Sequence, residues 1–264
     1  MKNFRLYGLP PYETAVIHGG PGAPGEMAPV ARRISSYAGV LEPLQTAKTI
    51  DAQIEELEET VTMQGDPPVI LIGWSWGAWL SFLWAARNPP MVKKLILVGS
   101  GPFEDKYARN IMKIRLERLK ERDRVEALLL IDRMDKPAGD ERIAEKNDAF
   151  MRLGKLISKA DDFHPVSHKD YALECQSDVF RSVWDQAEKL RKSGELLQAG
   201  KNIQCPVVAI HGVHDPHPAE GVRRPLTRIL KDFRFVLLEK CGHKPWIERA
   251  AKNKFFSVLS EELC

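Results

Sequence analysis

The feature that most constrains this chain is the pentapeptide GWSWG at Gly73–Gly77. It follows an apolar run, PVILI, and precedes GAWLSFLWAAR, which is hydrophobic on nearly every side and so predicts a buried helix. A serine flanked in this way is the pattern of a nucleophile on a sharp strand-to-helix turn. The turn leaves no room for side chains at its glycines, and it holds the Ser75 hydroxyl at a helix N-terminus, where backbone N–H groups favour negative charge. An accidental Gly-Ser-Gly turn is the alternative, and the flanking elements argue against it.

Short apolar runs alternate with segments of helical period along much of the chain. Most runs lack a polar alternation, which is typical of strands covered on both faces. Helical periodicity is clearest where Ile50, Ile54, Leu57 and Val61 form one stripe. The pattern predicts an α/β fold with a mostly parallel sheet and crossover helices. The strand candidates are Thr14–Ile17, Pro68–Ile72, Lys94–Val98, Pro206–Ile210 and Arg234–Leu238, with a weaker run at Gly39–Leu44.

The stretch 103–200 differs from the rest of the chain. It is charged, rich in helical pattern and free of good strand runs, and its mixed charge is typical of solvated faces of amphipathic helices. We therefore expect a core formed by residues 1–102 and 201–264, and a helical cap of roughly four helices at 103–200. Such a cap would lie over the carboxyl edge of the sheet, where active sites of open α/β sheets are found.

A glycine-rich loop, HGGPG at His18–Gly22, directly follows the first strong strand candidate. Acyl transfer requires N–H donors aimed at a developing oxyanion. We expect one donor from the backbone of Trp76, the residue after the nucleophile, and the other from Gly20. A plain Gly/Pro-rich connection is the alternative.

A serine nucleophile also requires a base and a group that orients the base. The expected chain order is serine, acid, histidine. His243 alone among seven histidines follows the last strand candidate, and Asp215 in HGVHD follows the strand candidate before it, 28 residues upstream. We predict Asp215 as the acid and His243 as the base. His18 and His211 are expected to have supporting or structural roles, and His214 and His217 to be ordinary loop residues. For His164 and His168, which lie in the stretch 103–200, exposed positions are favoured over the alternative of contact with substrate.

Other classes of protein are disfavoured. A net charge of +3 argues against a dedicated nucleic-acid or membrane-surface protein. No apolar run of 18 residues and no signal-peptide pattern are present in the sequence. Without a G-x-G-x-x-G or P-loop pattern we expect no nucleotide cofactor. The cluster of His211, His214, Asp215 and His217 does not make a convincing metal site.

The four cysteines are widely spaced and form no CxxC pair. We expect free thiols and a cytoplasmic location. The cysteines are Cys175, Cys205, Cys241 and Cys264.

In their order, GWSWG, HGGPG, HGVHD and CGHKPW resemble the α/β-hydrolase fold superfamily. Within it, HGGPG is similar to the loop of the proline iminopeptidases, which remove N-terminal proline. That family has Gly-Gly where this chain has Gly73-Trp74, so we expect the Trp74 indole to crowd the substrate near the nucleophile. Acidic cap residues hold the substrate amine in that family, and Glu174 is the candidate here.

The resemblance also implies extra strands before the HGGPG loop. Only 13 residues precede Thr14, so we expect six or seven strands, with Asn3–Leu6 as the first.

These expectations describe a serine hydrolase that forms an acyl-enzyme on a small ester, an amide or an N-terminal peptide bond. A proline iminopeptidase-like aminopeptidase acting on a short peptide is favoured. The alternatives are a carboxylesterase, a thioesterase or a C–C bond hydrolase with the same triad, and a non-catalytic small-molecule receptor. A receptor has no need of a complete triad together with both oxyanion donors, Gly20 and Trp76. The sequence leaves the substrate and the oligomeric state open.

Overall fold

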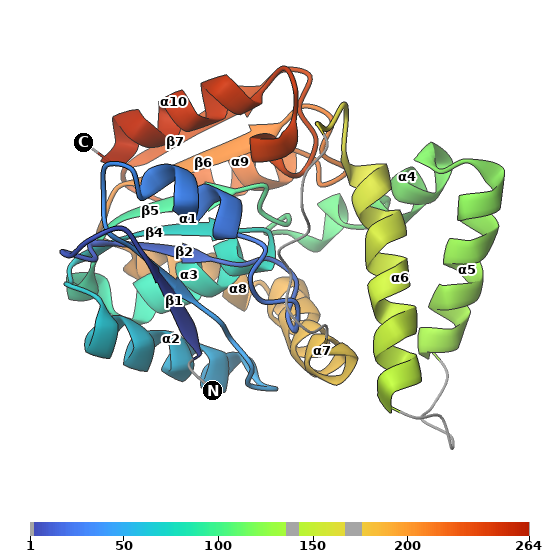
Figure 1. The fold of residues 1–264 in the computed structure, drawn as a ribbon, viewed down its shortest axis with the longest axis horizontal. Helices are drawn as coiled ribbons and strands as arrows, with labels where there is room; N and C mark the ends of the chain where they lie inside the picture. Colours follow the sequence, from blue (N-terminus) through green and yellow to red (C-terminus); the bar gives the residue numbers. More distant parts are fainter. Residues whose placement is uncertain (1–2, 136–142, 167–175, 264) are drawn as a thin grey trace.

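The computed structural model describes residues 3–135, 143–166 and 176–263, and a seven-stranded sheet lies at its centre (Figure 1). The strand order is β1-β3-β2-β4-β5-β6-β7. β1 pairs antiparallel with β3, and the other neighbours are parallel. The predicted α/β fold is thereby confirmed. The strands are β1 Phe4–Tyr7, β2 Thr14–Ile17, β3 Val40–Pro43, β4 Val69–Trp74, β5 Val92–Val98, β6 Val207–Gly212 and β7 Phe233–Leu238.

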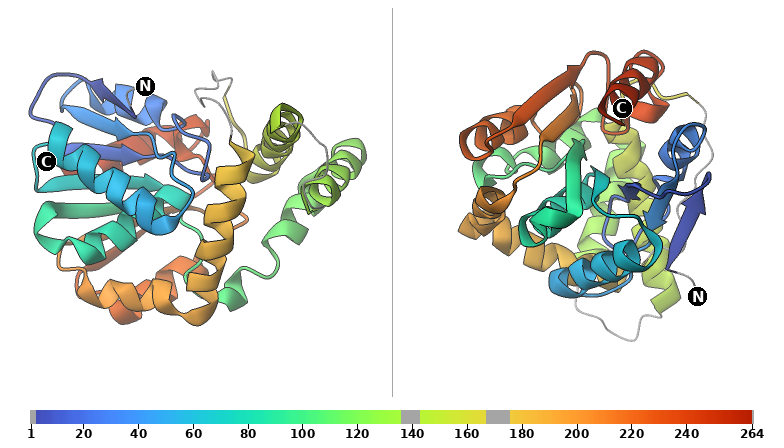
Figure 2. Two further views of the ribbon diagram at one scale, coloured as in Figure 1. Left: turned by 90° about the horizontal axis from the view of Figure 1, so that it is seen from below. Right: turned by 90° about the vertical axis from the view of Figure 1, so that its left-hand side faces the viewer.

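Helices cover both faces of the sheet (Figure 2), which explains the apolar runs without alternation. Successive side chains of a strand point to opposite faces. Leu71 therefore joins the hydrophobic cluster under α2 and α3, whereas Ile70 and Ile72 join the cluster under α1 and α10. The covering helices are α1 Ala28–Ile34, α2 Ile50–Gln64, α3 Trp76–Arg87, α9 Glu220–Ile229 and α10 Lys252–Leu263, with short 3₁₀ turns η1 Pro89–Met91, η3 Gly200–Asn202 and η4 Pro245–Ile247.

Helix α3 is almost wholly buried, as its composition predicts. Its N-terminus starts at the serine of GWSWG and its axis runs beneath the sheet. Helix α2 is capped at its N-terminus by Thr49, whose hydroxyl accepts a hydrogen bond from Ala52 N at 3.2 Å, and at its C-terminus by Gly65. Buried residues of these two helices pack against one face of the sheet in a single hydrophobic cluster.

The stretch 103–200 is helical where it is described. Its elements are η2 Asp105–Tyr107, α4 Ile111–Arg118, α5 Glu121–Asp135, α6 Ile143–Asp161, α7 Ser177–Ser193 and α8 Glu195–Ala199. α5 and α6 lie side by side next to the core (Figures 1 and 2) and share a small cluster formed by Leu119, Ala127 and Ala160. In contrast, Val179 and Val183 of α7 belong to the main core cluster. The extent of the cap as a separate unit stays a prediction.

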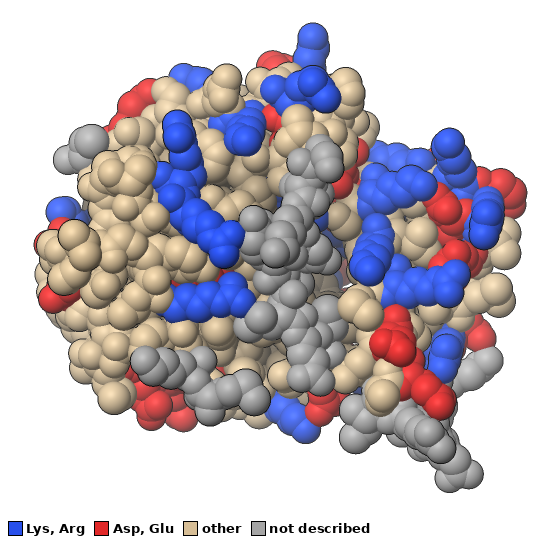
Figure 3. All heavy atoms as spheres, viewed as in Figure 1, with Lys and Arg blue, Asp and Glu red and all other residues tan. Residues whose placement is uncertain are grey.

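The surface of α5 and α6 carries interspersed basic and acidic side chains (Figure 3). Arg152 pairs with Glu126 and Lys159 pairs with Asp123, so acidic groups of α5 offset basic groups of α6. This is the mixed, solvated face that the sequence indicates.

Among the helices that the structure describes, none has the length and apolar character needed to cross a bilayer. Cys205 and Cys241 are free thiols, and Cys241 is buried. Cys175 and Cys264 lie outside the described residues.

Candidate active site

Ser75 lies in a strained turn between β4 and α3. Its backbone has φ 55° and ψ −115°, a conformation that residues with side chains rarely adopt. The flanking glycines make the turn possible, because a Cβ on Gly73 would lie 2.3 Å from Gly77 O. The Ser75 N–H donates to Val98 O at 3.0 Å, which ties the turn to the end of β5. The serine therefore lies at the carboxyl edge of the sheet, at the N-terminus of α3.

The glycine-rich loop after β2 lies against the same helix N-terminus. A Cβ on Gly77 would lie 2.4 Å from the carbonyl oxygens of both Ile17 and His18, so the chain segments touch backbone to backbone. Gly20 has φ +28° and is partly exposed. This approach brings the loop beside the first turn of α3, where N–H groups are free of intrahelical partners. The assignment of Gly20 and Trp76 N–H groups to an oxyanion hole stays a prediction.

His18 braces that loop. Its ring is fully buried, and burial lowers its pKa to about 4, so the ring is neutral. Nδ1–H donates to Gly19 O at 2.7 Å, and Nε2 accepts from Gln45 N at 3.2 Å. Both nitrogens are thus used by the backbone, which agrees with the structural role expected from the sequence.

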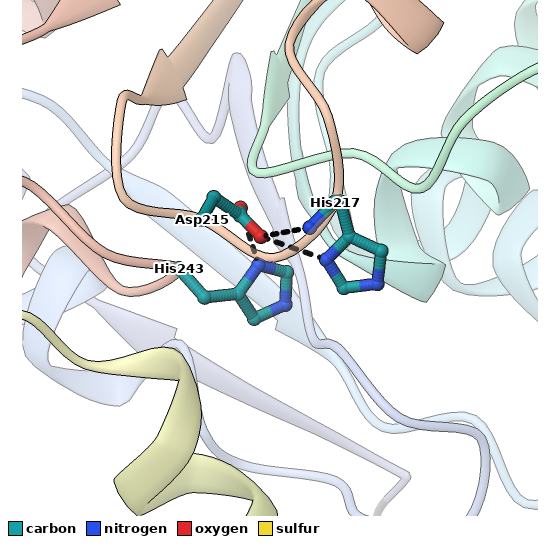
Figure 4. A group of neighbouring side chains, drawn as sticks. All are labelled: Asp215, His217 and His243. Carbon is teal, nitrogen blue, oxygen red and sulfur yellow. Dashed lines mark hydrogen bonds and ion pairs between the residues drawn. The ribbon is translucent and has the colours of Figure 1, made fainter. Parts of the chain in front are cut away.

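Asp215 follows β6 and is completely buried. Its Oδ2 accepts a hydrogen bond from His243 Nδ1 at 2.7 Å, and its Oδ1 accepts from His217 Nδ1 at 2.8 Å and His217 N at 2.9 Å (Figure 4). Burial by itself would raise the pKa of Asp215, but the charge that His243 carries when protonated and the hydrogen bond from His217 hold it well below its ordinary value. The carboxylate is therefore ionised and fully oriented.

His243 lies in the loop between β7 and η4. Burial would lower its pKa, but the nearby Asp215 carboxylate outweighs burial and raises it. Trp74 supports the loop, because its indole Nε1–H donates to His243 O at 2.9 Å and the two rings lie 5.2 Å apart. The Asp215 hydrogen bond occupies Nδ1 and leaves Nε2 as the nitrogen that can accept a proton.

Gly99 explains how His243 reaches from the end of β7 toward the serine. β5 and β6 lie between β7 and β4, so the ring must pass over the ends of both. A Cβ on Gly99 would lie 2.9 Å from His243 O and 3.1 Å from its Nδ1. Gly99 also has φ +50° and donates its N–H to Ile210 O at 2.9 Å. Glycine at the end of β5 is therefore required by the backbone conformation and by the ring above it.

Glu248 is a supporting residue that no motif in the sequence indicates. Its side chain is completely buried and accepts backbone N–H groups from Gly242 at 2.9 Å and from Phe163 and His164 at 2.7 Å each. Gly242 precedes the proposed base, and the other two residues follow α6. The carboxylate thus joins the His243 loop to the segment that leaves the cap helices, and a glutamate five residues after the histidine gave no signal of this.

A second connection runs from α4 and α6 to the same loop. The guanidinium of Arg115 binds both oxygens of Asp161 at 2.8 and 2.7 Å, and Asp161 O accepts the His243 N–H at 3.0 Å. The C-terminal end of α6 therefore lies at the carboxyl edge of the sheet, next to the proposed base.

The remaining candidates divide into three cases. Trp74 is 4% exposed and packs edge-on against Trp246 at 5.1 Å, so the structure places it under the His243 loop; its contact with substrate stays a prediction. The His214 ring packs edge-on against Phe163, with the ring centroids 5.0 Å apart. Glu174 and His168 lie outside the described residues.

His217 differs from its expected role as an ordinary loop residue. Its ring lies on the Asp215 carboxylate, and the available signal was a histidine two residues after the acid. In the described part of the chain, Asp215, His217 and His243 form the one group of three or more His, Cys, Asp or Glu side chains whose metal-binding atoms all lie within 4.8 Å of one another. In this arrangement each ring donates Nδ1–H to one carboxylate oxygen, so the three groups satisfy each other by hydrogen bonds.

Comparison with known proteins gives a family and a set of relatives. Residues 17–252 match the model of the alpha/beta hydrolase family. A pimeloyl-[acyl-carrier protein] methyl ester esterase from Chromobacterium violaceum is 25% identical over 201 residues, which cover 74% of this chain and 70% of that protein. A protein with the same description from Neisseria meningitidis is 26% identical over 200 residues, which cover 75% and 71% of the two chains.

Solved structures show the same fold at low identity. VinJ superposes with a TM-score of 0.70 at 18% identity, covering 98% of this chain and 93% of its own. The monoacylglycerol lipase of Paleococcus ferrophilus has a TM-score of 0.62 at 14% identity, with 98% and 97% covered. The enol-lactonase of Burkholderia xenovorans has a TM-score of 0.60 at 18% identity, with 98% and 95% covered.

Proposed function

The chain belongs to the alpha/beta hydrolase family, and from that premise we propose that it hydrolyses small carboxylic esters through an acyl-enzyme on Ser75. The observation that carries the proposal is the arrangement at the carboxyl edge of the sheet. A strained serine follows β4, and a buried aspartate after β6 holds a histidine after β7 at 2.7 Å. This is the set of groups that acyl transfer requires.

In the proposed reaction, neutral His243 accepts the Ser75 proton at Nε2 as the oxygen attacks the ester carbonyl. The ionised Asp215 keeps Nδ1–H directed toward itself and stabilises the imidazolium that forms. The backbone N–H groups of Trp76 and Gly20 would stabilise the oxyanion of the tetrahedral intermediate. His243 then donates its proton to the leaving alcohol, and the same groups activate water to release the acid.

An ester is favoured over an N-terminal peptide bond. The two curated relatives are ester hydrolases by description, and the solved structures named above include a lipase and a lactonase. The support for the aminopeptidase was the HGGPG loop together with Glu174, and that glutamate lies outside the described residues. The loop alone serves an esterase equally well, because both reactions require the same oxyanion donors.

The test is a substrate panel measured on wild type, Ser75→Ala and Ser257→Ala. Ser257 is an exposed serine on α10 whose hydroxyl bonds Glu261, so its substitution controls for loss of a serine away from the site. The panel contains p-nitrophenyl acetate, butyrate and octanoate, and prolyl and alanyl p-nitroanilides with free and acetylated amines. The proposal expects ester turnover that Ser75→Ala abolishes and Ser257→Ala retains. Faster turnover of the prolyl anilide with a free amine than of any ester would support the aminopeptidase function instead. No turnover of any substrate would favour a receptor.

A further inference from the structure

One carboxylate in the site serves two imidazole rings. Asp215 Oδ2 accepts from His243 Nδ1, and Asp215 Oδ1 accepts from the Nδ1 of His217 and from its backbone N–H. The ring centroids of the two histidines lie 4.7 Å apart at 35°, and their Nε2 atoms point away from the carboxylate (Figure 4). A serine hydrolase triad requires only the first of these rings. The second ring is a buried donor that the proposed mechanism does not use.

The protonation of His217 follows from its surroundings. A single negative charge stabilises one imidazolium, and a second cation beside it would be repelled. Burial lowers the pKa of His217 to about 4, whereas Asp215 raises the pKa of His243. His217 is therefore a neutral donor over the range in which His243 titrates. His211 fixes the backbone behind it, because its Nε2–H donates to His217 O at 2.7 Å.

We propose that His217 is a positioning residue of the triad, whose Nδ1–H holds Oδ1 of Asp215 so that Oδ2 faces His243. This rests on the proposed function, because it assigns His217 a role in the same triad. The hydrogen bond has two consequences. It restricts rotation of the carboxylate, and it draws negative charge away from Oδ2. Without it, Asp215 would hold the protonated form of His243 more tightly and would orient its ring less well.

Other charged groups face this cluster, and a substitution at His217 leaves all of them in place. The charge of Arg115 on α4 interacts with the rings of His217 and His243. The charge of Arg118 on α4 interacts with Asp215, and that of Asp161 at the end of α6 interacts with His243. His211 of β6 approaches Asp215 Oδ2 at 3.6 Å, and His214 precedes Asp215 in the same loop. Because these groups stay the same in the variants, a change in the His243 pKa on substitution of His217 reports the loss of its Nδ1–H donor.

The experiment compares His217→Leu with His217→Asn, and His214→Leu is the matched control from the same loop. Asparagine can place an N–H donor where Nδ1 lies, whereas leucine cannot. His217→Leu should lower kcat about tenfold at little change in KM. It should also move the midpoint of the kcat–pH profile upward by about half a unit. His217→Asn should restore both toward wild type. His214→Leu removes a ring that interacts with Asp215 through charge alone, so it should change both much less than His217→Leu does.

A second readout does not depend on turnover. Protein labelled with ¹⁵N-histidine allows the His243 ring to be titrated directly by NMR in each variant, with thermal unfolding as the check on folding. The proposal expects the same upward shift in His217→Leu and its reversal in His217→Asn. If the leucine variant does not fold, His217→Gln, which moves the donor toward the Nε2 position, takes its place.

Two results would overturn the role of His217. The first is a leucine variant with wild-type kcat and an unmoved His243 midpoint. The second is an asparagine variant as impaired as the leucine variant, since the ring's packing would then matter and its donor would not. Failure of the proposed function looks different, because wild type itself would show no Ser75-dependent ester turnover while the NMR shift could still be measured.

Discussion

Replacing Gly99 with alanine tests whether the end of β5 sets the position of the proposed base. Gly99 has φ +50°, and a side chain in the left-handed region costs about 1–2 kcal/mol. The new Cβ would also lie 2.9 Å from His243 O and 3.1 Å from Nδ1, so the loop must shift by a few tenths of an ångström. Misplacement of a catalytic group by about 1 Å can cost about 100-fold in rate, so we expect about a tenfold loss of kcat for this shift.

Gly194→Ala is the matched control. Gly194 has φ +84° at the C-terminus of α7, and a Cβ there would meet nothing within 4 Å. Urea unfolding should show a loss of about 1–2 kcal/mol in Gly194→Ala and at least that loss in Gly99→Ala, where the contact with His243 adds to the backbone cost. Initial rates on the best ester of the panel should fall only in Gly99→Ala. Equal rates in the two variants would refute the argument that Gly99 makes room for His243.

Three further predictions concern the same loop and its acid. Glu248→Gln should lower the free energy of unfolding by about 2–3 kcal/mol, because one amide oxygen cannot accept three N–H groups. A free energy of unfolding, measured with urea, within about 0.5 kcal/mol of the wild-type value would contradict this. Asp215→Asn should fold normally yet lower kcat by about 10³–10⁴-fold, since an amide can favour the wrong His243 tautomer; normal turnover would mean that another group orients the ring. Turnover should rise with pH through a midpoint above the ordinary pKa of histidine, because Asp215 raises the His243 pKa and only the neutral ring accepts a proton. Protonated His243 contributes to the free energy of unfolding, and this contribution should be lost as pH rises through the same midpoint. A free energy of unfolding that increased over that pH range would contradict the raised pKa of His243.

Much of the fold was predictable because its signals are local. The strand TAVI occupies Thr14–Ile17 as predicted, and Gly65 ends the helix that begins at Ile50. The first strand is Phe4–Tyr7, one residue later than expected, because its register is set by antiparallel pairing with β3. Pairing of this kind depends on a distant segment, so a single strand's sequence does not determine it.

The positions of the candidate site residues in the fold could be predicted from the order of the motifs along the chain. Ser75, Asp215 and His243 each follow a recognisable strand, and the parallel sheet brings those strand ends to one edge. The supporting residues were not predictable in this way. Glu248 acts on the backbone of Gly242 and Phe163, which lie 6 and 85 residues away, and such contacts leave no pattern in one sequence. Helix α7 shows the same limit, since its charge pattern gave no indication that Val179 and Val183 join the main core cluster.

The central claim is that Ser75 is a nucleophile activated by His243. The most direct measurement is reaction of the protein with a fluorophosphonate, followed by intact mass and peptide mapping, in wild type, Ser75→Ala and His243→Ala. The account predicts one adduct per chain on Ser75, no adduct in Ser75→Ala, and labelling slowed by orders of magnitude in His243→Ala. An adduct that persists in Ser75→Ala, or folded wild-type protein that the reagent never labels, would contradict it.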